Sequence, residues 1–254
     1  MNKLYFYGHN CFVAESAAAL LIIDPWLTPQ GAFFGSWHQF PDNTHLRQPL
    51  VEKTADKDTY VYLTHEHRDH FDPETLSMLA AAPRFRGFFI PAFHDPYLRE
   101  QLEAYGKSVT EVADTHKQAV TDDIGIQVFV SDVGVNHDSA VLVTTPDFTL
   151  LNQNDCKIFD RLQTIELPRI NYYSVQFSGA TWHPVCFRMP DEDKRRISEK
   201  KLPSSSTMCW APSAFCGRIS TCLRPGLQCS LFSTRSSAPS PAASLRTSSS
   251  WSIS

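Results

Sequence analysis

Short apolar runs, separated by glycine, proline and polar turn residues, make up most of residues 1–202. Runs of this length that are rich in β-branched and aromatic residues are typical of strands. Residues 20–23 are apolar at every position, which predicts a strand covered on both faces. The expected strands are Lys3–Tyr7, Cys11–Glu15, Ala19–Asp24, Asp58–Thr64, Phe88–Ile90, Thr110–Val112, Ile126–Val130, Ala140–Thr145, Phe148–Asn152 and Asn171–Gln176.

A few helices are expected among these strands. Asp72 is suited to cap a helix in which Pro73 is the first residue. Further helices are expected at Pro96–Tyr105 and Asp191–Lys201, whereas Pro29–Gln48 is loop-like. Strands interspersed with helices, with polar residues at the strand ends, predict a layered α/β fold whose functional site lies on strand-end loops.

Composition divides the chain into residues 1–202, expected to form one domain, and a tail, 203–254. All 27 acidic residues and all 10 histidines precede the tail, which contains four of the seven cysteines and is rich in serine. The tail is consistent with a disordered Ser-rich extension. A metal or disulfide module on its cysteines fits poorly, because their spacing matches no usual zinc motif. We favour a third interpretation, an out-of-frame translation, because acidic residues are absent and the change is abrupt.

Charge and cysteine usage narrow the class of protein. The net charge of −4 argues against a nucleic-acid partner. The sequence has no apolar run of the length that a transmembrane helix needs, so no membrane association is expected. It shows no secretory signal, and Cys11, Cys156 and Cys186 form no disulfide framework, which favours the cytoplasm.

One segment concentrates the candidate chemistry: His65-Glu66-His67-Arg68-Asp69-His70, expected between a strand and a helix. In an extended segment, His65, His67 and Asp69 project to one side, and His70 can point back to the same place. Neutral imidazole and carboxylate groups are ligands for zinc, iron or manganese. The alternative is a surface cluster of histidines, but four potential ligands within six residues at a junction between a strand and a helix make that explanation a poor one.

This His-x-His-x-Asp-His pattern resembles that of the metallo-β-lactamase superfamily. The resemblance implies a four-layer αβ/βα sandwich with a one- or two-metal site at one edge, and zinc as the first expectation for the metal. It also implies roles for particular residues: a first metal held by His65, His67 and His137, a second held by Asp69, His70 and Asp155, catalytic carboxylates at Asp69 and Asp155, and a histidine oriented by Asp24.

A closer resemblance, over roughly residues 15–200, is to the metallo-β-lactamase-like domain of CMP-N-acetylneuraminate hydroxylase and its bacterial relatives. It rests on residues 24–26, 37–41, the histidine motif, 152–156 and 176–184. In that family a Rieske iron–sulfur domain usually accompanies this one, but the sequence has no Cys-x-His ligand pairs for it. The start Gly8-His9-Asn10 more loosely resembles lactonase-type relatives that act on sugar phosphates.

The sequence departs from the superfamily pattern after Asp155. A closing histidine is expected beyond a late strand, but the only later histidine is His183, which comes too early. We therefore expect an incomplete second metal site, missing closing elements in the C-terminal part, and marginal stability.

Three hypotheses for function follow. The first is a metal-dependent hydrolase acting on an ester, lactone, amide or phosphodiester in a small molecule. The second is an iron-dependent hydroxylase-type domain for a nucleotide sugar, served by an iron–sulfur electron donor. The third is an inactive truncated product. Candidate residues of the substrate pocket are Trp37, His38, His94, Trp182 and His183.

Overall fold

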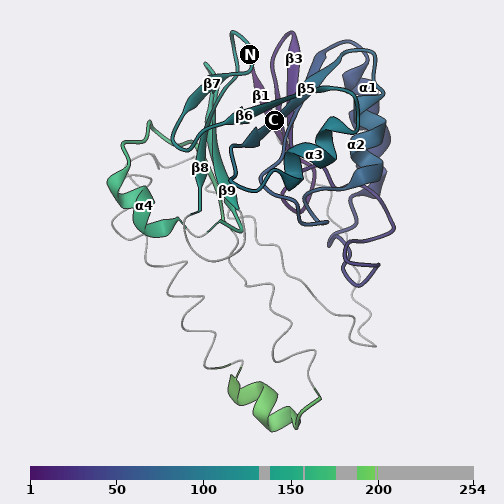
Figure 1. Ribbon diagram of the computed structural model, residues 1–254, viewed down its shortest axis with the longest axis vertical. Helices are drawn as coiled ribbons and strands as arrows, with labels where there is room; N and C mark the ends of the chain where they lie inside the picture. The colour runs from purple at the N-terminus through teal and green to yellow at the C-terminus, as the bar shows by residue number, and fades with distance from the viewer. Residues whose placement is uncertain (132–137, 157, 176–187, 198, 200–254) are drawn as a thin grey trace.

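Two β-sheets pack face to face in the computed structural model of the chain, which describes residues 1–131, 138–156, 158–175, 188–197 and 199 (Figure 1). The first sheet has the order β1–β2–β3–β4–β5–β6. Its strands are β1 (Lys3–Phe6), β2 (Phe12–Glu15), β3 (Ala19–Ile23), β4 (Asp58–Tyr62), β5 (Phe85–Pro91) and β6 (Ser108–Val112). The first three strands are antiparallel, and β3 to β6 run parallel. The carboxyl ends of β3 to β6 therefore meet at one edge.

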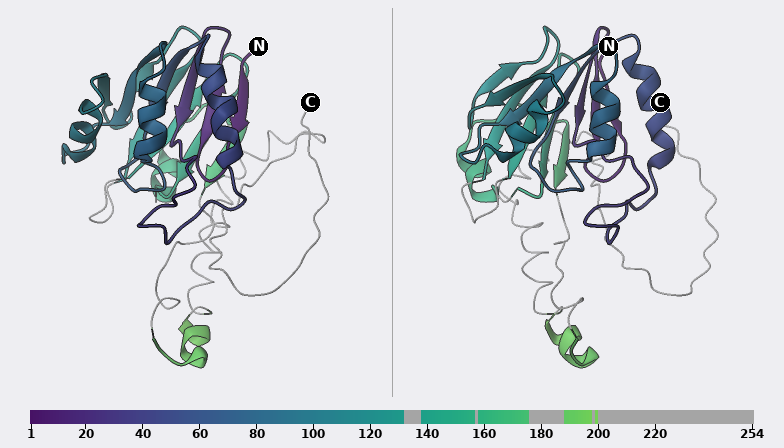
Figure 2. Two further views of the ribbon diagram at one scale, coloured as in Figure 1. Left: turned by 90° about the vertical axis from the view of Figure 1, so that its right-hand side faces the viewer. Right: turned by 45° about the vertical axis from the view of Figure 1, so that its right-hand side comes forward.

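Helices α1 (Arg47–Thr54), α2 (Pro73–Ala80) and α3 (Tyr97–Glu103) lie along the first sheet (Figure 2). They bury Leu50, Leu76 and Leu98 against the apolar side chains of one face of that sheet. All five residues of β3 are fully buried, because Leu20 and Ile22 face the helices while Leu21 and Ile23 face the second sheet. The prediction of a strand covered on both faces is confirmed.

The second sheet has the order β11–β10–β9–β8–β7. Its strands are β7 (Lys117–Ala119), β8 (Gly125–Val130), β9 (Ser139–Thr144), β10 (Thr149–Asn154) and β11 (Tyr172–Val175). One face packs on the first sheet through Val128, Val141 and Leu150, and the other packs on α4 (Phe159–Thr164) through Leu151 and Leu162. The described residues thus form helix, sheet, sheet and helix layers, as the α/β sandwich prediction requires.

The expected loop at Pro29–Gln48 is wrong at its end, where α1 begins at Arg47. Only Leu50 and Thr54 of this helix are buried, so its sequence shows no apolar stripe of helical period. Pro49 lies in the first turn, where a missing N–H removes no intrahelical hydrogen bond. Helix α4 and strand β7 were not expected either, because each is too short to produce a clear period.

The expected helix boundary at Asp72 is confirmed, with Pro73 as the first helical residue. Residues 191–197 are helical, within the expected third helix. None of the helices in the described part of the chain combines the length and apolar composition needed to cross a membrane. The tail lies outside the described residues, so the division of the chain near residue 202 stays a prediction.

Candidate metal centre

The histidine motif follows β4 at the edge where the parallel strands end. Asp24 directly follows the neighbouring strand β3, and its backbone N–H donates to the carbonyl of Tyr62 at 3.1 Å. The Asp24 Oδ1 atom in turn accepts a hydrogen bond from the backbone N–H of Thr64 at 2.9 Å. The pairing of β3 with β4 therefore carries Asp24 to Thr64, the residue that precedes the motif.

The expected extended conformation of the motif is wrong beyond its first residues. The backbone N–H groups of His70 and Phe71 both donate to the carbonyl of His67, at 2.9 and 2.7 Å, so the chain turns there. The turn brings Asp69 and His70 back toward the side chains of the preceding histidines. His65 Nε2 and His67 Nδ1 lie 2.9 Å apart, within hydrogen-bond distance.

Two buried polar side chains fix the imidazoles. The Asp24 carboxylate, fully buried, lies 2.8 Å from His70 Nδ1 and accepts a hydrogen bond from Thr64 Oγ1 at 2.7 Å. Thr64 Oγ1 also lies 3.0 Å from His65 Nδ1. A partner on Nδ1 fixes the orientation of a histidine and leaves Nε2 to face a ligand. The structure thus places Asp24 where the resemblance puts an orienting carboxylate, although its role stays a prediction.

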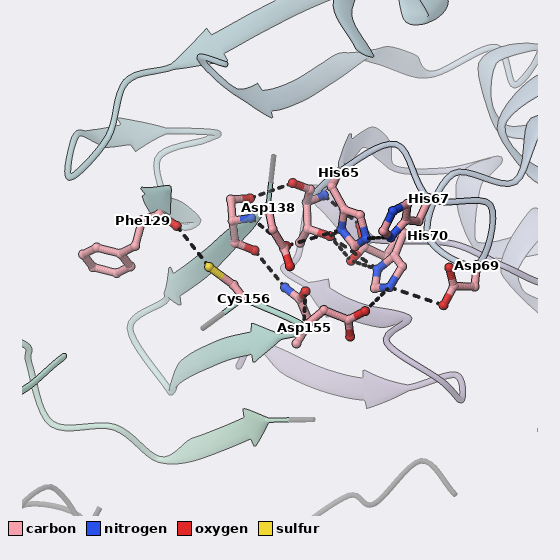
Figure 3. Close-up of polar contacts among 12 residues, drawn as sticks. His65, His67, Asp69, His70, Phe129, Asp138, Asp155 and Cys156 are labelled. Atoms are coloured by element: carbon pink, nitrogen blue, oxygen red, sulfur yellow. Dashed lines mark hydrogen bonds and ion pairs between the residues drawn. The ribbon is translucent and has the colours of Figure 1, made fainter. Parts of the chain in front are cut away.

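The second sheet supplies carboxylates to the same place (Figure 3). Asp155 follows β10, and its Oδ2 lies 3.8 Å from His70 Nε2. Asp138 precedes β9, and its Oδ1 lies 3.4 Å from His65 Nδ1. The side chains of Asp155 and Asp138 are 25% and 14% exposed.

A hydrogen-bonded link joins the sheets behind these carboxylates. Ser139 Oγ donates to the carbonyl of Thr64 at 2.8 Å and lies 2.9 Å from the Tyr62 hydroxyl. Asn154 Nδ2 donates to the Ser139 carbonyl at 2.9 Å. The link sets the distance between the histidine motif on one sheet and the two carboxylates on the other.

Six side chains form two groups of three, and within each group the potential ligand atoms lie within 4.8 Å of one another. One group is His65, His67 and Asp155, and the other is His9, Asp69 and His70. Within them, His70 Nε2 is buried without a hydrogen-bond partner, 3.6 Å from Asp69 Oδ2 and 3.8 Å from Asp155 Oδ2. A buried polar atom without a partner is costly, and a cation between the imidazole and the carboxylates would satisfy all of them. The residues present therefore fit a metal.

The charges of His65 and Asp69 agree with that fit. Burial, with His70 and His67 nearby, holds the pKa of His65 well below its usual value, so this imidazole is neutral at neutral pH. Burial would raise the pKa of Asp69, but His70 and His9 outweigh it and lower that pKa, so the carboxylate is charged. Neutral imidazole and charged carboxylate are the ligating forms.

Two further shifts report crowded charge. Burial and the neighbouring Asp155 raise the pKa of the Asp138 carboxyl to about 8. Burial would lower the pKa of His70, but the carboxylates of Asp69 and Asp24 raise it well above its usual value. Both shifts reflect an excess of carboxylate in a small buried volume, which a bound cation would relieve.

Several expected site residues lie elsewhere or outside the described residues. His137, Trp182 and His183 are outside them, so their expected roles stay predictions. His38 is exposed and its Nε2 lies 3.1 Å from the Gly35 carbonyl within its own loop, while His94 is exposed after β5.

The loop that carries Trp37 reaches the cluster through another residue. Trp37 is partly buried and packs on Phe33, whose ring lies 6.2 Å from that of His67. Phe33 is therefore the residue of this loop whose ring lies near a histidine of the motif. Its φ of 50° is unusual for a bulky residue.

The sequence offered no clear signal for three residues of the site. Thr64 was expected only as the last residue of a strand, Asp138 was not singled out, and His9 entered only through a loose resemblance. A topological signal exists for His9. Strand β1 is antiparallel to β2, and β2 to β3, so β1 runs in the same direction as β3 and the turn after it reaches the same edge.

Comparison with known proteins now defines the class. The two packed sheets, with helices on both outer faces, form the metallo-β-lactamase fold. The sequence profile of the family described as the beta-lactamase superfamily domain matches residues 3–146. The chain belongs to the beta-lactamase superfamily.

Similarity to individual proteins points in two directions. A protein of Mycolicibacterium smegmatis named as a Rieske 2Fe-2S iron–sulfur protein is 32% identical over 211 residues, which are 80% of this chain and 39% of that protein. A metal-dependent hydrolase of Mesorhizobium japonicum is 26% identical over 176 residues, 64% of this chain and 67% of that one. The chain spans about two-fifths of the length of the first of these relatives.

Among solved structures, a mutant of CmlA beta-hydroxylase superposes with a TM-score of 0.51 at 17% sequence identity. The match covers 80% of this chain and 44% of the other. At this identity the likeness supports the fold.

Proposed function

We propose that the chain is a metal-dependent hydrolase that acts on a small molecule with an ester, lactone, amide or phosphodiester bond. The observation that carries the proposal is the convergence of imidazole and carboxylate groups on His70 Nε2, a buried atom without a hydrogen-bond partner. The relatives named as metal-dependent hydrolases support the same class of reaction.

In this proposal His65, His67 and Asp155 hold one cation, while Asp69 and His70 hold a second. A divalent cation in such a site supplies a Lewis acid and lowers the pKa of a bound water molecule toward neutrality. Zinc is the first candidate, and iron or manganese suit the same donors.

The side chains of the cluster have separate tasks. Asp155 takes part in the first group and lies 3.8 Å from His70 Nε2 of the second, which supports a role in which its carboxylate would contribute to both cation sites. Asp24 and Thr64 keep the imidazoles of His70 and His65 in fixed orientations. Because Asp155 is the most exposed carboxylate of the cluster, a substrate is expected to approach from its side, past Phe33 and His67.

The test is the metal content of the purified 254-residue chain, with hydrolysis of chromogenic ester, lactone and phosphodiester substrates measured in parallel. We expect one or two zinc or manganese ions per chain and hydrolysis that proceeds without oxygen. His67→Ala should lose metal and activity, because it removes a proposed ligand. The imidazole is partly exposed, so its removal should leave the core intact. His116→Ala, at an exposed histidine outside the cluster, is the matched control.

Little or no metal in a folded chain would contradict the proposal and favour the inactive product. Metal retained in full by His67→Ala would contradict the assigned ligands.

A second candidate function is favoured by the relatives named as Rieske proteins. In this candidate the cluster holds iron, and the chain hydroxylates a substrate such as a nucleotide sugar with electrons from an iron–sulfur partner. Imidazole and carboxylate ligands suit non-haem iron as well as zinc. Bound iron, with turnover that consumes oxygen and needs a reductant, would select this candidate over hydrolysis.

A further inference from the structure

His9 lies in a tight turn between β1 and β2 at the edge that carries the metal cluster. The backbone N–H of Cys11 donates to the Gly8 carbonyl at 2.9 Å, and that of Tyr7 donates to the Cys11 carbonyl at 2.8 Å. Gly8 and His9 both have positive φ, 93° and 50°. A non-glycine residue in this region is uncommon, and residues in sparsely populated backbone conformations cluster at active sites and ligand-binding positions.

The imidazole of His9 is aimed at the cluster. Its ring packs edge-on against Trp26, with centroids 5.0 Å apart, and against His70, with centroids 5.6 Å apart. The side chain is only 10% exposed. Its Nε2 lies 3.0 Å from Asp69 Oδ2, the oxygen that is 3.6 Å from His70 Nε2.

Two explanations of this contact differ in what they leave unsatisfied. A hydrogen bond from His9 to Asp69 would satisfy those two groups but leave His70 Nε2 buried without a partner. A cation among the three would satisfy all of them. Two ligand atoms that each lie about 2.1 Å from one ion are roughly 3.0–3.4 Å apart, for angles from a right angle to the tetrahedral angle. The separation of His9 Nε2 from Asp69 Oδ2 agrees with this spacing, and that of His70 Nε2 is slightly longer.

We propose that His9 is a third protein ligand of the cation held by Asp69 and His70. The inference rests on the proposed function, in which this cluster binds metal, and it adds a ligand that neither the sequence motif nor the family resemblance supplied. It gives the second ion two imidazoles and a carboxylate from the described residues alone.

The experiment is a calorimetric titration of the metal-free 254-residue chain with Zn²⁺, followed by visible absorption of the Co²⁺-loaded protein. His9→Asn removes the imidazole while keeping a residue type that tolerates the positive φ. We expect His9→Asn to weaken the binding of one zinc ion by about 100-fold or more and to change the Co²⁺ bands. His116→Asn, at an exposed histidine in another loop, should leave both unchanged.

A second variant separates ligation from hydrogen bonding. His9→Gln keeps an N–H donor for Asp69 but is a poor ligand for zinc, so it should bind zinc as weakly as His9→Asn. Wild-type affinity in His9→Gln, with weakened binding in His9→Asn, would overturn the inference in favour of a hydrogen bond. Wild-type affinity in both variants would also overturn it.

The outcomes also separate this inference from the proposed function. A wild-type chain that binds zinc tightly, with both His9 variants unchanged, removes His9 alone from the site. A wild-type chain that binds no zinc or cobalt overturns both.

Discussion

The two sheets contribute to the candidate metal centre in different ways. The first sheet supplies the imidazoles, and fully buried Asp24 ties His70 to the strand ends while Thr64 contacts His65. The second sheet supplies Asp138 and Asp155, which are more exposed, and burial together with Asp155 raises the pKa of Asp138. A set of hydrogen-bonded imidazoles on the first sheet thus faces carboxylates that are closer to solvent. The orientation of the imidazoles is fixed from the first sheet, whereas both sheets contribute charge to the site.

The largest effect is expected on the first sheet. Asp24→Ala would leave His70 Nδ1 and the Thr64 N–H and hydroxyl without their buried partner, so the free energy of unfolding should fall by about 3–5 kcal/mol. Asp24→Asn is the matched variant, because asparagine keeps one acceptor and tolerates the φ of 42°. Urea denaturation of the metal-free chain measures both. If Asp24→Ala lowers the free energy of unfolding by less than about 1 kcal/mol, the hydrogen bonds of Asp24 do not stabilise this strand end as proposed.

A substitution on the second sheet should affect zinc affinity more than stability. Asp155→Asn is expected to weaken zinc binding by about 100-fold or more, because a carboxylate shared by both groups is lost. Stability without metal should change by less than about 1 kcal/mol, since the side chain is partly exposed. Zinc titration and thermal denaturation test this, with Asp160→Asn, at an exposed position of α4, as the control. A large loss of stability with unchanged affinity would reverse the comparison.

The link between the sheets should give an intermediate effect. Ser139→Ala removes the hydrogen bonds to the Thr64 carbonyl and the Tyr62 hydroxyl, which should cost about 1–3 kcal/mol of stability. Tyr62→Phe removes one of these contacts and should cost about 1 kcal/mol. The double variant should cost less than the sum of the two, because both singles break the same contact. Strictly additive losses would show that the two hydroxyls do not act together.

The smallest effect is expected at Glu15, at the opposite end of β2 from the His9 turn. Burial would raise the pKa of Glu15, but ion pairs with Lys53 and Lys57, each at 2.8 Å, lower it to about 2. A lowered pKa means that this contribution is present above the unfolded-state value of about 4.5 and is lost as pH falls toward 2. With partly exposed lysines we expect on the order of 1–2 kcal/mol.

Denaturation of the wild type and Glu15→Gln at pH 7, 4 and 2.5 measures this contribution. The difference in stability between the two should shrink as the pH falls, while zinc affinity at pH 7 stays the same in both. A difference independent of pH would contradict the ion-pair explanation.

Sequence reasoning predicted the features that have a clear local pattern. It missed very short elements and contacts between distant segments. The uniformly apolar residues of β3 and the Asp72-Pro73 boundary of α2 are local patterns, and both were predicted correctly. Helix α1 was missed because its burial comes from Leu50 and Thr54 alone. Trp37 and His38 were chosen as pocket residues by type, and that role stays a prediction. Phe33 of the same loop, which has its ring near His67, was not singled out.

The sequence by itself determined the donor chemistry and its location at the end of a strand. Four potential ligands within six residues are costly to bury without polar partners, and they follow an apolar run that predicts a buried strand. Only the tertiary structure decided which groups meet. His9, Asp138 and Asp155 come from separate strand ends, and strand direction with packing of two sheets brings them within contact of the motif. Such proximity depends on pairing between distant segments, which a local pattern does not encode.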